Sequence, residues 1–319
     1  MTATDIAEAR AGTGAPLFDR VAFIGIGLIG SSMARAIAKL GLAREIVCSA
    51  RSQATCDKAL ELGLVSRAST DAGAMVAGAD LVVLCSPVGT YADVAARIAP
   101  HCAPGAIVTD VGSVKQAVIR DVAPHLPEGV HLVPGHPVAG TEHSGPEAGF
   151  AELFENRWCI LTPPAGANEE AVAKIAGMWR RFGSNVEFME ASHHDKVLAI
   201  TSHLPHLIAF TICGTADDLA DETRNEVLKF AASGFRDFTR IAASDPEMWR
   251  DVFLHNKEAT LDILGRFTEE LFVLQRAIRM GDGQQLFDYF TRTRAIRRGI
   301  ISQGQETPEP DFGRRREET

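Results

Sequence analysis

Short apolar segments alternate with amphipathic segments along the chain up to about Met189. The apolar segments are three or four residues long and rich in Val, Ile and Leu, whereas the amphipathic segments have the period of a helix. Short, almost wholly apolar strands that alternate with helices are typical of a parallel sheet covered on both faces. We therefore predict a doubly wound α/β domain over residues 19–190, with strands at Val21–Ile24, Glu45–Cys48, Leu81–Leu84, Ala106–Thr109, His131–Val133, Cys159–Leu161 and Val186–Phe188.

After Met189 the pattern changes to long stretches of helical periodicity, without a convincing strand up to Ile301. One helix start is marked by Ser244 as the predicted N-cap, Pro246 in the first turn and Glu247 placed to complete a capping box. These patterns predict an all-helical domain over residues 191–302. Residues 1–18 and 303–319 lack periodicity and are predicted to be flexible tails.

Composition places the chain among globular proteins. It has 319 residues, of which 46% are hydrophobic and 23% charged, so wholesale disorder is excluded. No apolar run reaches the roughly 18–20 residues of a membrane-spanning helix, and the first residues do not resemble a signal peptide, so we expect a cytoplasmic protein. The net charge of −9, without a basic cluster in the folded part, argues against a nucleic-acid partner.

The six cysteines form no C-x-x-C pair and are spread over the whole chain. We interpret them as reduced, buried side chains rather than as a disulfide framework or a zinc site. Cys85 ends an apolar run but has no visible activating neighbour, so we do not expect it to be a nucleophile.

A glycine-rich motif follows the first predicted strand and opens a predicted helix. Gly25, Gly27 and Gly30 form a G-x-G-x-x-G motif, which in this context binds a dinucleotide in a Rossmann-type domain. The free N–H groups at the start of the helix suit a pyrophosphate. We assign cofactor contacts to these glycines, to Leu28 and Ile29 between them, and to Ser86-Pro87 after a later strand.

The end of the second predicted strand indicates which dinucleotide binds. An NAD-selective site usually has Asp or Glu about 20 residues after the motif, and this chain has Ala50 there. Arg51 and the hydroxyl groups of Ser49 and Ser52 could hold the 2′-phosphate of NADP, so NADP is favoured. Alternatively, Arg51 stacks on the adenine or faces water, which would leave NAD or dual specificity open.

Conspicuous polar residues follow the carboxyl ends of three predicted strands, where ligands of open parallel sheets bind. They are Ser86-Pro87, the run from Asp110 to Lys115, and the run from Gly135 to Gly145. Because His136 is flanked by Gly and Pro, we interpret it as a catalytic base rather than a structural histidine.

Four motifs resemble the prephenate/arogenate (cyclohexadienyl) dehydrogenase family of tyrosine biosynthesis. They are GHPVAGTEHSG from Gly135, DVGSVK from Asp110, SHLPH from Ser202 and GFRDFTRIAASDP from Gly234, and the resemblance extends from Val21 to Ile301. It implies oxidative decarboxylation of prephenate, arogenate or both: hydride passes to NAD(P), the ring carboxylate leaves as carbon dioxide and the ring becomes aromatic.

The resemblance also implies roles for individual residues. His136 is the base for the substrate hydroxyl group, and Ser113 contacts that hydroxyl and orients the histidine and the nicotinamide. Arg240 binds a substrate carboxylate, which suits the guanidinium fork. The remaining assignments are to residues near the substrate side chain or the pocket mouth, namely His206, Thr141, Glu142 and, at a position near the cleft, Trp249.

The family further implies a homodimer formed through the helical domain, with Arg236 and Asp237 able to act across subunits. With about 18 residues before the first strand and about 16 after Ile301, we expect neither a fused chorismate mutase domain nor a C-terminal regulatory domain.

Three alternatives stay open. A β-hydroxyacid or 6-phosphogluconate type dehydrogenase shares this domain plan and would use a lysine such as Lys196. A binding module without catalysis needs only the cofactor site. A metal site could be formed by His193-His194-Asp195 with His203 and His206, although the implied chemistry needs no metal, and His194 or His203 is better interpreted as a capping or core residue at the domain junction.

Overall fold

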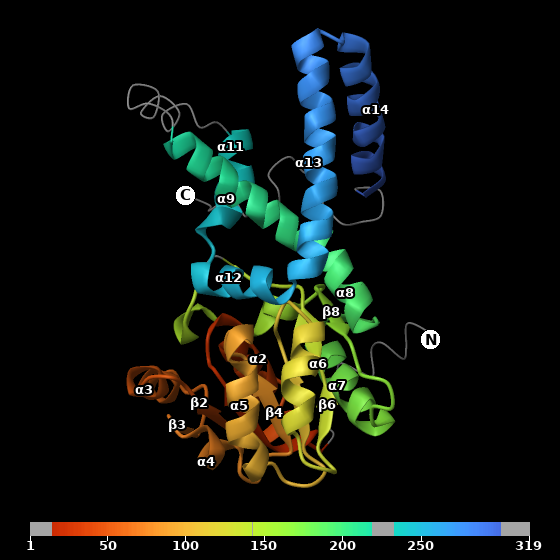
Figure 1. Cartoon of the computed structure of the whole chain (residues 1–319). Helices are drawn as coiled ribbons and strands as arrows, with labels where there is room; N and C mark the ends of the chain where they lie inside the picture. Colours follow the sequence, from red (N-terminus) through yellow and green to blue (C-terminus); the bar gives the residue numbers. More distant parts are fainter. Residues whose placement is uncertain (1–14, 142, 219–232, 301–319) are drawn as a thin grey trace, which may run out of the picture. The chain divides into compact units, whose positions relative to one another are not determined.

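The computed structural model describes residues 15–141, 143–218 and 233–300 (Figure 1). The predicted tails at residues 1–18 and 303–319 therefore lie almost wholly outside the described residues. The chain divides into two compact units, Met1–Leu261 and Asp262–Thr319. The domain boundary expected after residue 190 falls inside the first unit, between a strand and a helix, and it stays a prediction.

The first unit contains a six-stranded parallel sheet in the order β3-β2-β1-β4-β5-β6. This doubly wound order confirms the predicted α/β architecture. The strand β3, which was not predicted, is short and only partly buried, so it has no apolar signature. The strands are β1 (Phe18–Ile24), β2 (Ala43–Ser49), β3 (Arg67–Ser69), β4 (Leu81–Leu84), β5 (Ile107–Asp110) and β6 (His131–Val133).

Side chains of successive strand residues pack on opposite faces of this sheet. Val21 and Phe23 of β1 belong to one buried cluster, whereas Ala22 and Ile24 belong to the other. Because both faces are covered, Val21–Ile24 is apolar at every position, which is the pattern that the sequence shows. The connecting helices are α2 (Leu28–Lys39), α3 (Gln53–Glu61), α4 (Ala72–Val76), α5 (Tyr91–Ile98) and α6 (Gln116–Val122), with short 3₁₀ turns η1 (Val88–Thr90), η2 (Ala99–His101) and η3 (Ala123–His125).

A separate three-stranded sheet follows β6, and here the structure differs from the prediction of one parallel sheet. Its strands are β7 (Gly135–Pro137), β8 (Trp158–Leu161) and β9 (Asn185–Phe188). The strand β7, which was not predicted, pairs antiparallel with β8, and β8 pairs parallel with β9. The His-Pro sequence hid this strand because Pro is rare inside sheets, but β7 is short and has a sheet neighbour on one side only. Between them lie η4 (Pro146–Ala148), η5 (Ala151–Phe154) and α7 (Glu169–Arg181).

The chain continues as helices, as predicted. The first, α8 (Ala191–Leu198), continues through a π-helical turn, η6 (Ala199–His203), into α9 (Leu204–Asp217). By length and composition alone the stretch Ala191–Asp217 could cross a membrane, a test that core helices of globular proteins also pass. The remaining elements are α11 (Ser233–Thr239), η7 (Arg240–Ala243), α12 (Pro246–His255), α13 (Lys257–Met280) and α14 (Gly283–Ile300).

The start of α12 corrects one local prediction. The N-cap is Asp245 rather than Ser244, and its side chain accepts a hydrogen bond from the backbone N–H of Met248 at 2.8 Å. Pro246 is therefore the first helical residue, where its missing N–H is harmless. The hydroxyl group of Ser244 instead donates to the carbonyl of Ile241.

Candidate active site

The glycine turn between β1 and α2 has the geometry of a phosphate-binding loop. Gly25 has a φ of +93°, and a Cβ there would lie 2.8 Å from the backbone of Cys85 and Ser86. A Cβ on Gly30 would lie 2.9 Å from the carbonyl oxygen of Gly25, so this glycine permits close packing of α2. Space is open around Gly27, which caps α2 without a side chain. The turn therefore fits a dinucleotide pyrophosphate at the helix N-terminus.

The residues after β2 are arranged around an exposed arginine. Ser49 is buried at the end of the strand, and Ser52 caps α3 by accepting a hydrogen bond from the backbone N–H of Thr55. The Arg51 side chain is 91% exposed, and its Nη1 lies 3.9 Å from Oε2 of Glu247 on α12. Arg51 is thus accessible to a ligand, with a carboxylate beside it.

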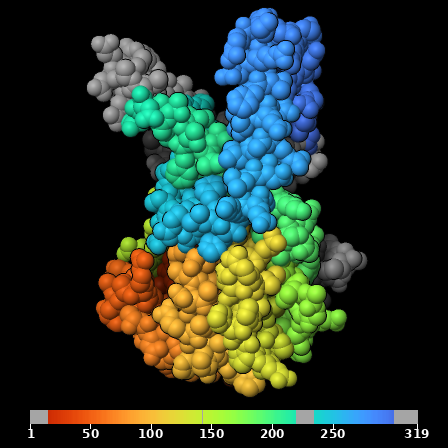
Figure 2. All heavy atoms as spheres, in the orientation of Figure 1, coloured from red at the N-terminus to blue at the C-terminus, as the bar shows by residue number. Residues whose placement is uncertain are grey.

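Ser86 and Pro87 form the turn after β4, and the 3₁₀ turn η1 that follows them contacts α12. The hydroxyl groups of Ser86 and Thr90 are 2.9 Å apart, and Thr90 also donates to the carbonyl of Pro87. Asp251 of α12 accepts a hydrogen bond of 3.2 Å from the N–H of Gly89. This contact holds α12 against η1, at the carboxyl end of β4. In Figure 2 the cyan to blue surface that includes α12 lies directly against the orange surface of the sheet domain.

A buried ion pair joins the end of β5 to β7. Nζ of Lys115 lies 2.5 Å from Oδ2 of Asp110 and donates to the carbonyl of Gly135. Asp110 also accepts the N–H groups of Gly112 and Gly135. Burial raises the pKa of Asp110 and lowers the pKa of Lys115, and the attraction and hydrogen bond between the two groups oppose both shifts. The N–H groups of Gly112 and Gly135 further oppose the shift of Asp110. The pair fixes the backbone on which the next residue, His136, is placed.

His136 is at one end of a hydrogen-bonded row of buried side chains, His136–His194–Asp195. It is 6% exposed, and its Nδ1 lies 2.8 Å from Nε2 of His194 on α8. Nδ1 of His194 lies 2.8 Å from Oδ1 of Asp195. The Asp195 carboxylate accepts two further hydrogen bonds, from the backbone N–H groups of Lys115 and Gln116 at the start of α6. Two segments far apart in the sequence are thereby joined at the candidate base.

The charge state of this chain follows from its burial. Burial lowers the pKa of His136 well below its usual value, and His194 and Lys115 lower it further. The pKa of His194 is also lowered, chiefly by burial. Burial alone would raise the pKa of Asp195, but hydrogen bonds from His194 and from backbone N–H groups hold it below its usual value. Both histidines are therefore neutral and Asp195 is ionised at neutral pH.

Two further polar residues lie beside this chain. Ser113 is half-buried in the loop between β5 and α6. His203, in the π-helical turn, is buried, and its Nδ1 lies 3.1 Å from Nδ2 of Asn256. The same amide donates to the backbone carbonyl of Asp195 at 2.8 Å. Burial lowers the pKa of His203 to about 4, so it is also neutral.

The residues assigned to substrate binding lie on the helical segments. The rings of His206 on α9 and Trp249 on α12 stack with centroids 3.7 Å apart. Nδ1 of His206 lies 2.8 Å from the carbonyl of Ser202. Burial and the charge of Arg240, the first residue of η7, lower the pKa of His206. Arg240, exposed to solvent, therefore belongs with His206 and Trp249 to one group.

Of the two residues assigned to the pocket mouth, Thr141 and Glu142, the structure describes only Thr141. Thr141 is exposed, and its hydroxyl accepts the N–H of His143 at 3.3 Å. Glu142 lies outside the described residues. Lys196, on which the β-hydroxyacid alternative depended, is exposed on α8.

Sequence reasoning missed the functional contacts of Lys115, His194 and Asp195. His194 and His203 do lie buried at the junction, as expected, but His194 also bonds to the candidate base. Among the described residues no group of His, Cys, Asp or Glu is arranged to hold a metal ion. The His-His-Asp sequence was the available signal, but only the fold shows that it points at His136.

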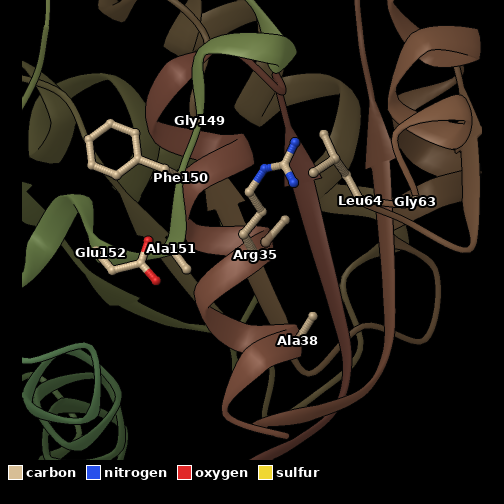
Figure 3. Close-up of a pocket in the computed structure, with 9 residues that line it drawn as sticks. Arg35, Ala38, Gly63, Leu64, Gly149, Phe150, Ala151 and Glu152 are labelled. Atoms are coloured by element: carbon tan, nitrogen blue, oxygen red, sulfur yellow. The ribbon is translucent and has the colours of Figure 1, made fainter. Parts of the chain in front are cut away.

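A pocket of about 430 Å³ lies away from these residues, between α2 and the segment from Gly149 to Glu152 (Figure 3). Arg35 points into it, and an ion pair of 2.6 Å joins Lys39 to Glu152 next to it. It contains none of the residues assigned above.

A dinucleotide-binding sheet followed by helices, with a neutral buried histidine near its carboxyl edge, defines a nicotinamide-dependent dehydrogenase. The family model for the prephenate dehydrogenase nucleotide-binding domain matches residues 33–188, and that for the prephenate dehydrogenase dimerization domain matches residues 190–292. The chain belongs to the prephenate dehydrogenase family.

Known proteins of this family are similar over most of the chain. The cyclohexadienyl dehydrogenase of Zymomonas mobilis is 41% identical over 88% of this chain and 96% of its own length. The prephenate dehydrogenase of Bacillus subtilis is 34% identical over 88% of this chain and 76% of its own. The crystal structure of prephenate dehydrogenase from A. aeolicus in complex with hydroxyphenyl propionate and NAD+ has a TM-score of 0.82 and 32% identity, covering 88% of this chain and 98% of that chain.

Proposed function

We propose that this protein oxidises and decarboxylates prephenate, arogenate or both, in tyrosine biosynthesis. The observation that carries the proposal is the neutral, buried His136 in β7, which follows β6 and lies against the end of β5, in a protein with the glycine turn of a dinucleotide site. Such a histidine can accept a hydroxyl proton near neutral pH. Family membership supplies the substrate class.

The residues divide the reaction between them. The glycine turn at Gly25, Gly27 and Gly30 would hold a nicotinamide dinucleotide, and this cofactor would supply the acceptor for the hydride on the ring carbon that carries the hydroxyl group. His136 accepts the proton of that hydroxyl, with Ser113 as a second contact. Arg240 binds a substrate carboxylate through its guanidinium fork. Loss of the ring carboxylate as carbon dioxide leaves its bonding electrons in the ring, which becomes aromatic. The ring oxygen then takes back the proton held by His136, which gives the phenol and regenerates the neutral base. The family resemblance assigns His206, Thr141 and Glu142 to the substrate side chain and the pocket mouth.

The cofactor that we propose is NADP in preference to NAD. Ala50 at the end of β2 offers no carboxylate to a ribose hydroxyl, and the exposed Arg51 is accessible to a 2′-phosphate. Contacts to the dinucleotide are proposed for Gly25, Gly27, Leu28, Ile29 and Gly30, then for Ser49, Ser52, Ser86 and Pro87.

We further propose a cytoplasmic homodimer formed through α13 and α14. These helices expose large apolar side chains that a partner chain would cover, among them Phe272, Ile278, Met280, Phe287 and Phe290. The name of the dimerization-domain family model supports this assignment. Size-exclusion chromatography with light scattering tests it, and a monomer at micromolar concentration would contradict it.

The function is tested by initial rates of nicotinamide reduction with prephenate or arogenate, each combined with NAD or NADP. We expect reduction with at least one substrate and a higher kcat/KM with NADP. The variant Lys196→Met should keep its activity, because this exposed lysine would be catalytic only if the protein were a β-hydroxyacid dehydrogenase. Failure of all four combinations, in protein that binds the cofactor, would refute the function.

A further inference from the structure

The bonded chain from Asp195 through His194 to His136 determines where the protons are. An ionised carboxylate only accepts hydrogen bonds, so Nδ1 of His194 must donate to Asp195 across their 2.8 Å contact. The Asp195 carboxylate is held in this state by the two N–H groups at the start of α6. His194 is 0% exposed, and the ring of a neutral histidine carries a single N–H.

The same reasoning passes from His194 to His136. Because the one proton of His194 is on Nδ1, its Nε2 has a lone pair and accepts the 2.8 Å hydrogen bond from His136. The proton of His136 is therefore on Nδ1. Its Nε2 is left with the lone pair that proton abstraction requires.

We propose that His194 and Asp195 are positioning residues that fix His136 in the tautomer whose Nε2 is the proton acceptor. This inference deepens the proposed function and rests on it for the identity of the base reaction. The chain also places an anionic carboxylate two hydrogen bonds from His136, so the positive charge that appears there on proton uptake is stabilised.

Replacing the Asp195 carboxylate by an amide should exchange donor and acceptor in both hydrogen bonds of the row Asp195–His194–His136. In Asp195→Asn the amide N–H₂ can donate to Nδ1 of His194, whose Nε2 then donates to Nδ1 of His136. The proton of His136 would move to Nε2, and the base would be blocked. The same oxygen of Asp195 accepts the N–H of Lys115 in the wild type, so this N–H loses its acceptor in the variant. We expect kcat to fall about 10²–10⁴-fold with a much smaller change in KM, since the glycine turn and Arg240 make no contact with Asp195 in this hydrogen-bonded row.

Two substitutions separate this role from a structural one. Asp195→Glu keeps an acceptor-only group, so it should retain more activity than the isosteric Asp195→Asn although its length fits less well. Asp121→Asn makes the same carboxylate-to-amide change on α6, at a residue that is not bonded to Asp195, His194 or His136. It should leave kcat and the histidine tautomers unchanged. Thermal unfolding of each variant measures the cost of altering the contacts at the start of α6.

The direct test is long-range ¹H–¹⁵N NMR of ¹⁵N-histidine protein, which distinguishes the two tautomers of neutral histidine without substrate. His136→Gln and His194→Gln identify the two signals among the ten histidines. We expect Nδ1–H for both rings in the wild type and Nε2–H in Asp195→Asn. An Nε2–H signal for wild-type His136 would overturn the inference, even if Asp195→Asn failed to fold. Correct tautomers in a wild type inactive on both substrates would instead refute the proposed function.

Discussion

The side chains around His136 are buried and bonded to one another, whereas the group around Arg240 is partly open to solvent. His136, His194 and Asp195 are at most 6% exposed, and each has a defined hydrogen-bond partner in the chain. Arg240 is exposed, and His206 beside it is only partly buried. The difference indicates a division of labour: the proton acceptor is fixed before substrate arrives, and the carboxylate-binding group is accessible to it.

The sharpest way to break this comparison is to remove the base. His136→Asn should lower kcat about 10²–10⁴-fold, the usual contribution of a general base, while cofactor affinity is kept. Initial rates and cofactor titration measure both quantities. The control His143→Asn changes an exposed histidine of the same sequence run and should behave as the wild type. A folded His136→Asn protein with most of its kcat would end the assignment.

The buried side of the comparison also predicts a stability effect. Lys115→Met leaves Asp110 without its cation, and breaking a buried ion pair on one side costs about 3–5 kcal/mol. Denaturant unfolding should show this loss. Lys39→Met, which breaks an exposed pair, should leave the unfolding midpoint nearly unchanged. Equal effects of the two substitutions would show that the Lys115–Asp110 pair does not support β7.

The open side of the comparison should respond in KM. Arg240→Lys keeps the charge but loses the bidentate fork, and a charge-assisted hydrogen bond of about 1.5–3 kcal/mol corresponds to a roughly 10- to 100-fold rise in KM. The rate at saturation should change little. Arg266→Lys, an exposed position on α13, is the control. An unchanged KM would remove Arg240 from carboxylate binding.

Acidification should affect this enzyme less than an ordinary histidine enzyme. Because burial depresses the pKa of His136, the neutral form persists as the pH falls below about 6.5, the usual value of histidine. At pH 5.5 an unperturbed base would lose about tenfold in kcat/KM, and we expect a smaller loss. A pH–rate profile measures it, and an acid limb at or above 6.5 would contradict the burial argument.

The smallest expected effect concerns the cofactor. Glu247 lies 3.9 Å from Arg51, so its charge opposes a 2′-phosphate there. Glu247→Gln should raise the ratio of kcat/KM for NADP over NAD by up to about fivefold, the scale of an exposed ion pair. Asp262→Asn, a change of the same charge on α13, should leave the ratio unchanged. A ratio unaffected by Glu247→Gln would show that Arg51 acts independently of α12.

The sequence was sufficient to predict those features of the structure that depend on local residue patterns. The parallel sheet and the helical half follow from periodicity, and Gly25 and Gly30 occupy the close approaches that their motif requires. Strand β7 was missed because three residues with a proline have no periodic signal. The bond from Lys115 to the carbonyl of Gly135 and the bond from the Lys115 backbone to Asp195 could not be predicted, since they span 20 and 80 residues and form only through the fold.

The central claim is that this chain couples hydride transfer to decarboxylation through His136. It is tested most directly by measuring carbon dioxide and reduced nicotinamide together, with prephenate or arogenate as substrate, for the wild type and His136→Asn. The account predicts equal amounts of both products from the wild type and a parallel loss of both in the variant. Nicotinamide reduction without carbon dioxide, or equal rates for the two proteins, would contradict it.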